Sequence, residues 1–216
     1  MESELAPPPP IAEQFADSAQ QREASTLGMW IFLATEVLFF GGLFLAYFIY
    51  RITYPAAFAA GSHTLSFWRG TINTAVLLTS SLTMALGDAY IKRGNWGALR
   101  NCVFATAFLG ILFLAIKASE YHEMYARHLV PGLPFDPRVS PPAQLFVFLY
   151  FAMTGLHAVH MVIGLGLMAW LLRLNHRGRL TAAQHAPVEM FGLYWHFVDC
   201  VWVFLYPLLY LIPALK

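Results

Sequence analysis

EMFGLYWHFVDCVWVFLY, residues 189–206, decides the fold of this 216-residue chain. The stretch is apolar enough to cross a membrane, yet it contains Glu189, His196 and Asp199. At helical spacing Glu189 and His196 lie about two turns apart on one face, and Asp199 follows one turn later. An ionisable side chain in hydrocarbon is costly unless it faces a protein neighbour, a lipid head group or water. We therefore expect a membrane helix whose polar seam contains these three residues.

The composition is that of an integral membrane protein. Hydrophobic residues make up 58% of the chain and charged residues only 12%, well outside the range of soluble domains. The net charge of +1 argues against a nucleic-acid partner, which would require a strongly basic surface. Cys102 and Cys200 fall in different predicted helices, so neither a disulfide nor a two-thiol metal site is expected.

Five apolar segments are long enough to cross the hydrocarbon core. A helix needs roughly 20 residues to span it, and such segments run at about 27–50, 71–91, 101–119, 145–172 and 189–212. The predicted fold is therefore all-α, a bundle of five transmembrane helices within residues 27–216. Residues 1–26, which include the run Pro7 to Pro10, are expected to form a flexible cytoplasmic tail.

The positions of Lys and Arg predict the orientation in the membrane. The short connections 92–100 and 173–179 each contain three basic residues, the pattern expected of cytoplasmic loops. The N-terminus is therefore expected inside and the C-terminus outside. Five spans are too few for a transporter with two matching halves, and no internal repeat is visible. We expect the chain to be one subunit of a larger complex.

Glu36 is the acidic residue of the first span, GMWIFLATEVLFFGGLF. At ~1.5 Å per residue it lies more than about 10 Å below the predicted cytoplasmic boundary, too deep to reach water. A carboxyl group in hydrocarbon favours its neutral form, which either donates a hydrogen bond or takes part in proton movement. Both roles stay open, and Glu36 is the proton-related candidate of the chain.

A histidine pair, His157 and His160, occupies one face of the fourth span in TGLHAVHMVIG. A haem or metal site would need further ligands at matching depth on facing helices, and the chain has a single HxxH pattern. We therefore interpret both histidines as neutral, hydrogen-bonded packing residues.

The remaining polar and aromatic candidates also favour structural roles. Glu120 stands one turn from Lys117 at the outer end of the third span, where an ordinary ion pair at the membrane interface is expected. Trp195 and Trp202 are interpreted as packing residues and interface anchors. No catalytic residue, metal ligand or cofactor site of the chain itself is predicted.

Five motifs occur along the chain in a fixed order: GMWIFLATEVLFF (28–40), NTAVLLTSS (73–81), ASEY (118–121), TGLHAVHMVIG (154–164) and YWHFVDCVWVFLY (194–206). Together they resemble subunit III of the haem-copper oxidases, the cytochrome c oxidase type in particular. The resemblance covers roughly residues 27–210. The chain lacks the first two spans of the long, seven-span members of this family, as does the short five-span bacterial form.

The resemblance implies a supporting role without redox chemistry in this chain. Such a subunit packs against subunit I in a bacterial plasma membrane, while subunits I and II hold the haem and copper that reduce oxygen. It supports proton uptake and holds phospholipid in a cleft between its helices. Glu36 matches the carboxylate of the family that reacts with carbodiimide. Packing and lipid contact are the roles implied for Glu120, His157, His160, Trp195, His196, Asp199 and Trp202. Glu189, from the polar seam of the fifth span, is a further candidate for the same roles.

Other functions stay open alongside this one. Quinol oxidases have a related five-span subunit, although Thr35, Glu36 and the ASEY motif favour the cytochrome c branch. A related short protein accompanies nitric oxide reductase as an accessory or assembly protein. A free-standing haem or metal enzyme of the membrane would instead show a visible absorption band or bound metal.

Overall fold

The computed structural model describes residues 14–132, 135, 139–176 and 186–211, and within them it contains six helices and no strand. Five helices are long and apolar enough to cross a membrane: α1 (Ser18–Thr53), α3 (Phe67–Lys92), α4 (Trp96–Ala126), α5 (Pro141–His176) and α6 (Ala186–Tyr210). The predicted all-α bundle with five membrane-spanning helices is confirmed. Arg177 and Arg179, which supported the predicted orientation, lie outside the described residues.

Two helices begin well before their predicted spans, because each has a side-chain cap. Asp17 accepts a hydrogen bond from the backbone N–H of Gln20 at 2.7 Å, so α1 begins at Ser18 and residues 18–26 of the expected tail are helical. Asn95 caps α4 in the same way, accepting from the N–H of Ala98 at 3.1 Å. The proline run of the tail lies outside the described residues.

A short helix, α2 (Pro55–His63), was not predicted, because it is too short to span a membrane. Its first residue is proline, whose missing N–H costs nothing in the first turn of a helix. Phe58 is fully buried, and the Ser62 hydroxyl donates to the carbonyl of Leu209 at 2.6 Å. Helix α2 is therefore attached to the end of α6.

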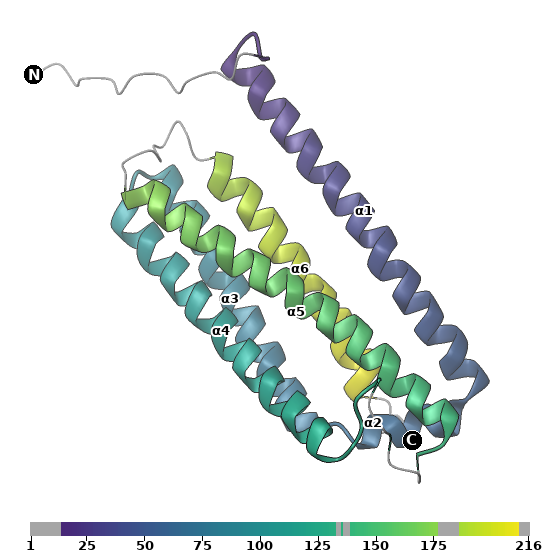
Figure 1. Cartoon of the computed structure of the whole chain (residues 1–216). Helices are drawn as coiled ribbons and strands as arrows, with labels where there is room; N and C mark the ends of the chain where they lie inside the picture. The colour runs from purple at the N-terminus through teal and green to yellow at the C-terminus, as the bar shows by residue number, and fades with distance from the viewer. Residues whose placement is uncertain (1–13, 133–134, 136–138, 177–185, 212–216) are drawn as a thin grey trace, which may run out of the picture.

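Helices α3 to α6 form the main bundle, and α1 lies to one side of it (Figure 1). Gly94, with φ 72°, reverses the chain between α3 and α4. Helix α1 contacts the bundle from about Phe32 to its end and diverges from α5 and α6 toward its start (Figure 1). Only 17% of its most apolar stretch is buried, against 56% in α6. We call the end where α1 begins the N-terminal end of the bundle, and the opposite end the C-terminal end.

Trp195 fills the centre of the bundle and is fully buried. Glycine lets α4 and α5 approach its ring: a Cβ atom added at Gly164 would lie 2.7 Å from the indole, and one at Gly110 would lie 3.0 Å from it. The indole N–H donates to the Ser80 hydroxyl on α3 at 3.1 Å. One side chain of α6 thus contacts the other three helices of the bundle.

Candidate functional site

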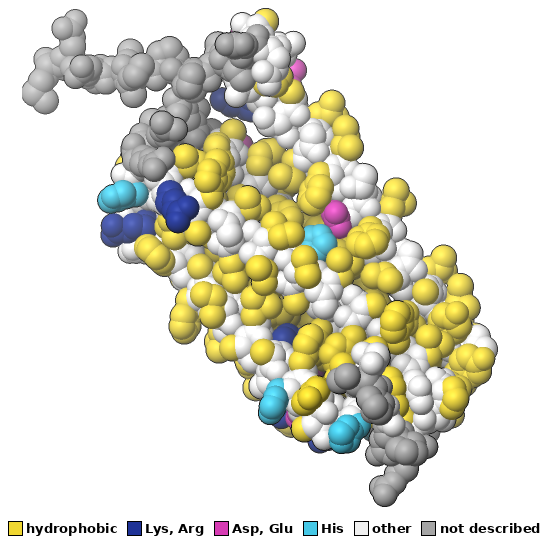
Figure 2. Space-filling model, in the orientation of Figure 1, with side chains coloured by type: hydrophobic (Ala, Val, Ile, Leu, Met, Phe, Trp, Pro, Cys, Tyr) yellow, Lys and Arg dark blue, Asp and Glu magenta, His cyan; other side chains and the backbone are white. Residues whose placement is uncertain are grey.

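A cleft of about 780 Å³ separates the first half of α1 from α5 and α6. Toward the N-terminal end it is lined by polar side chains of α1: Ser18, Gln21, Arg22 and Ser25. Its deep end is apolar and aromatic, and is formed by Phe32, Ile163 and Tyr194. Figure 2 shows that apolar side chains cover the middle of the molecule on this view, as expected of a surface in hydrocarbon.

Glu36 and His160 meet one turn beyond the deep end of this cleft. The carboxyl oxygen Oε2 of Glu36 lies 3.2 Å from Nε2 of His160, and both side chains are largely buried. The distance is within ion-pair range, although the two atoms are not aligned as an N–H···O hydrogen bond. This contact between α1 and α5 was not predicted, because the spacing of residues within one helix says nothing about the register of two helices.

The two histidines of α5 differ in their surroundings. The Nδ1 atom of His160 lies 2.9 Å from the carbonyl of Leu156, one turn earlier in the helix. His157 is buried between the rings of Phe113 and Trp202, both with centroids 5.3 Å from its own. Neither ring nitrogen of His157 has a hydrogen-bond partner in the described part of the chain. The prediction of a hydrogen-bonded residue was therefore wrong for His157.

Two tryptophans join α6 to α3. The indole N–H of Trp195 donates to Ser80, and that of Trp202 donates to the Thr74 hydroxyl at 3.1 Å. Both rings are fully buried, as expected of packing residues. Neither ring anchors the membrane interface, which was the other role that we had expected. A buried indole usually finds a partner for its N–H, and small hydroxyl residues on α3 supply it here.

His196 and Asp199 also face α3, but they are not hydrogen-bonded to each other. The Nδ1 atom of His196 lies 2.6 Å from the Ser81 hydroxyl. Asp199 is 3% exposed and lies near Ser80 and Ser81, yet neither of its carboxyl oxygens makes a hydrogen bond within the described residues. Their place between α3 and α6 agrees with a helix-to-helix seam, whereas a direct pair of the two does not form.

Glu189 lies apart from these two residues, at the N-terminal end of the bundle. Its carboxylate is 2.9 Å from Nζ of Lys92, which also contacts Asp88 at 2.8 Å. All three side chains are partly exposed. Glu189 therefore occupies a different environment from His196 and Asp199, so the three residues of the opening motif do not form one cluster.

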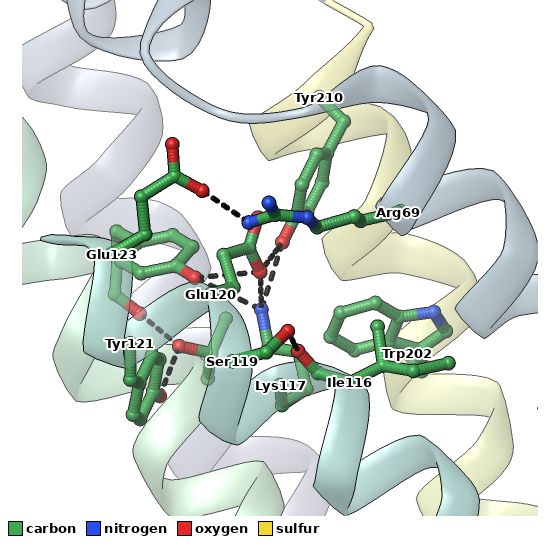
Figure 3. A network of polar contacts seen from close by, with 12 residues as sticks. Arg69, Ile116, Lys117, Ser119, Glu120, Tyr121, Glu123, Trp202 and Tyr210 are labelled. Atoms are coloured by element: carbon green, nitrogen blue, oxygen red, sulfur yellow. Dashed lines mark hydrogen bonds and ion pairs between the residues drawn. The ribbon is translucent and has the colours of Figure 1, made fainter.

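Lys117 and Glu120 form a buried ion pair near the C-terminal end of the bundle. Nζ of Lys117 lies 2.7 Å from Oε2 of Glu120, and the two residues are 3% and 4% exposed. Nζ also donates to the hydroxyls of Tyr210 at 2.8 Å and Tyr150 at 3.0 Å. Figure 3 shows Lys117, Glu120 and Tyr210 directed at one another. The pair therefore lies inside the bundle, whereas we had expected it at the membrane interface.

The two tyrosines complete a closed network across three helices. Both hydroxyls donate to Oε2 of Glu120, Tyr210 at 2.7 Å and Tyr150 at 3.0 Å. Nζ of Lys117 is also 4.8 Å from the ring centroid of Tyr150 and 5.1 Å from that of Trp202. Three acceptors and several aromatic faces surround the ammonium group. Lys117, Tyr150 and Tyr210 were missed as site residues.

A smaller polar cavity of about 300 Å³ lies beside this network. Glu123 at its edge pairs with Arg69 and Arg127, and Figure 3 shows the Arg69 contact. These side chains are partly exposed, which limits their contribution to stability. Across the described residues, no group of three or more His, Cys, Asp or Glu side chains is placed to hold a metal ion.

Comparison with known proteins identifies the family of the chain. The sequence profile described as "Cytochrome c oxidase subunit III" matches residues 16–213. Cytochrome c oxidase subunit 3 of Synechocystis sp. is 36% identical over 186 residues, which cover 86% of this chain and 74% of that protein. The protein of the same name from Thermostichus vulcanus is 34% identical over 187 residues, 86% of each chain.

A third relative is a longer protein. The haem-copper oxidase subunit I+III of Aeropyrum pernix is 32% identical over 192 residues, which cover 85% of this chain and 22% of that protein. The resemblance found in the five motifs is therefore confirmed by a match along almost the whole sequence. The five long helices agree with a membrane protein of this kind. The chain belongs to the cytochrome c oxidase subunit III family.

Proposed function

We propose that this chain is the non-catalytic subunit III of a respiratory terminal oxidase in a bacterial plasma membrane, with its N-terminus in the cytoplasm. The complex transfers electrons from cytochrome c to oxygen, forms water and translocates protons. Haem and copper belong to subunits I and II, and this chain stabilises subunit I. Family membership supports this proposal, as does the Aeropyrum pernix relative, whose name joins subunits I and III in one chain.

The cleft beside α1 is the observation that carries the proposal beyond family membership. Its apolar deep end suits an acyl chain, and its polar edge lies where a head group would be at the membrane surface. Arg22 forms no ion pair with any described residue, so its guanidinium is available to a phosphate. Phospholipid bound in this cleft would hold α1, which has few contacts of its own, against the bundle.

Glu36 is the residue proposed to support proton uptake. It lies one helical turn beyond Phe32, the last residue of α1 that lines the cleft, and its side chain is 16% exposed. A carboxyl group at such a depth is retained in membrane helices mostly where it has a functional partner. Its place beyond the cleft, on the side proposed to face the cytoplasm, supports a role in proton entry.

Purification of the chain with its partners tests the proposed complex. An affinity-tagged chain is extracted in mild detergent, and the bound proteins are identified by mass spectrometry together with a haem spectrum. We expect a haem-copper subunit I and a subunit II. Recovery with nitric oxide reductase or quinol oxidase subunits, or as a colourless protein without partners, would contradict the proposal.

Lipid retention tests the cleft. Arg22→Gln should lower the amount of phospholipid that co-purifies with the complex, because it removes the cation at the polar edge. Arg51→Gln, in the last turn of the same helix, is the matched control and should leave the phospholipid content unchanged. Equal lipid content in the two variants would show that this cleft does not hold the head group.

A further inference from the structure

Glu36 and His160 are the titratable pair that joins α1 to α5. We infer that the two side chains share one proton, and that His160 thereby controls the protonation and chemical reactivity of Glu36. This inference rests on the proposed role of Glu36 as a proton-exchanging acid. It adds a positioning residue, His160, that acts through that acid.

The backbone fixes which nitrogen of His160 faces the acid. Nδ1 lies 2.9 Å from the carbonyl oxygen of Leu156, which only accepts hydrogen bonds, so this nitrogen carries the hydrogen. In the neutral ring Nε2 then has a free lone pair, and it lies 3.2 Å from Oε2 of Glu36. A protonated Glu36 can donate to Nε2, and transfer of the same proton gives an imidazolium beside a carboxylate.

The surroundings favour one proton for the pair. With one proton the pair is electrically neutral, whereas loss or gain of a proton leaves a net charge in hydrocarbon, which is costly. On α6, the hydroxyl of Tyr194 donates to the backbone carbonyl of His160 at 2.9 Å, so its proton is already committed. On α5, His157 packs on Phe113 and Trp202 and makes no hydrogen bond with the pair.

The position of the pair adds an access route. Phe32 of α1 and Ile163 of α5, at the deep end of the cleft, each stand about one turn from Glu36 and His160. Phe40 covers the other side, with its ring centroid 5.4 Å from that of His160. An apolar reagent that enters the cleft therefore reaches the pair from the N-terminal end of the bundle.

Labelling by dicyclohexylcarbodiimide in the purified oxidase complex tests this inference. The reagent takes the carboxyl proton onto one nitrogen while the carboxyl oxygen bonds to its central carbon, so an O-acylisourea forms and no atom is lost. The rate therefore follows the fraction of Glu36 that is protonated. In the native chain it should stay constant around neutral pH and rise only at acid pH, where the pair takes up a second proton despite the cost of the added charge and Glu36 is then always protonated.

His160→Phe removes the competing base. For a proton shared equally, labelling of Glu36 at neutral pH should rise about twofold and lose its dependence on pH. His160→Gln keeps a polar side chain in place of the ring and should also lose the pH dependence, which gives a second test if the phenylalanine variant does not assemble. His157→Phe, a matched change one turn away, should keep the native rate and pH profile.

The outcomes separate this inference from the proposed function. A native pH profile in both His160 variants would overturn the sharing of a proton, even with Glu36 labelled normally. An equal change in His157→Phe would also overturn it, because the effect would then reflect general loosening of α5. Absence of any label on Glu36 in the native complex would instead overturn its proposed role as the reactive acid.

Discussion

Replacing Lys117 by methionine should lower the free energy of unfolding more than the loss of any other lysine or arginine among the described residues. Methionine keeps most of the side-chain volume, so the main loss is three N–H donors at 2.7, 2.8 and 3.0 Å. Removing one partner of a buried ion pair costs roughly 3–5 kcal/mol. The hydroxyls of Tyr150 and Tyr210 still donate to Glu120, so we expect the lower end, about 3 kcal/mol.

The free energy of unfolding is measured by denaturant titration in detergent micelles, with helix content read by circular dichroism. Lys92→Met is the matched control, because it is the same substitution in a lysine with two carboxylate partners. Its side chain is 43% exposed, and exposed ion pairs contribute less than about 1 kcal/mol. The difference between the two variants therefore isolates the effect of burial.

A double variant tests whether the network acts as one unit. In Lys117→Met with Glu120→Gln, the amide can still accept from the two tyrosines and no buried charge remains. We expect the double variant to recover about 2 kcal/mol relative to the sum of the single losses. A cost for Lys117→Met no greater than that of Lys92→Met, or simple additivity with Glu120→Gln, would refute the closed, charged network.

Two packing predictions concern the centre of the bundle. Gly164→Ala should cost about 1–3 kcal/mol in the same titration, because its Cβ would lie 2.7 Å from Trp195, whereas Gly166→Ala has open space and should be neutral. Equal costs would contradict the close contact. Trp202→Phe keeps one aromatic ring but removes the N–H that Thr74 accepts and leaves a cavity in place of the five-membered ring, so we expect a loss of about 1–3 kcal/mol. No loss in Trp202→Phe would show that this hydrogen bond adds nothing in the membrane.

Much of the fold could be predicted because length and apolarity alone define membrane helices. The ends were less accurate, since caps such as Asp17 and Asn95 extend α1 and α4 beyond their apolar runs. Helix α2 escaped prediction because its nine residues are too few to cross hydrocarbon. Hydropathy measures the fit to lipid, and it carries no information on helical turns that lie across the end of a bundle.

The candidate site was predicted less well, because its contacts join helices that are far apart in sequence. Glu36 and His160 were both singled out, but nothing in either segment showed that they meet. The pairing of Lys117 with Glu120 followed from their spacing, whereas its burial depends on Tyr210, 90 residues beyond Glu120. Spacing along one helix predicts a face, and only the packed bundle shows what that face contacts.

The loose attachment of α1 has a consequence for biogenesis. Among the described helices, α1 contacts α2, α5 and α6 but neither α3 nor α4. Chains are made from the N-terminus, so α1 enters the bilayer first and its main partners arrive last. Through most of synthesis Glu36 is therefore without His160, and the contact between the two can form only after α5 has been inserted. The contacts of α1 with α5 and α6 are therefore among the last to form, so a chain interrupted before α5 would leave α1 in the bilayer without its main partners.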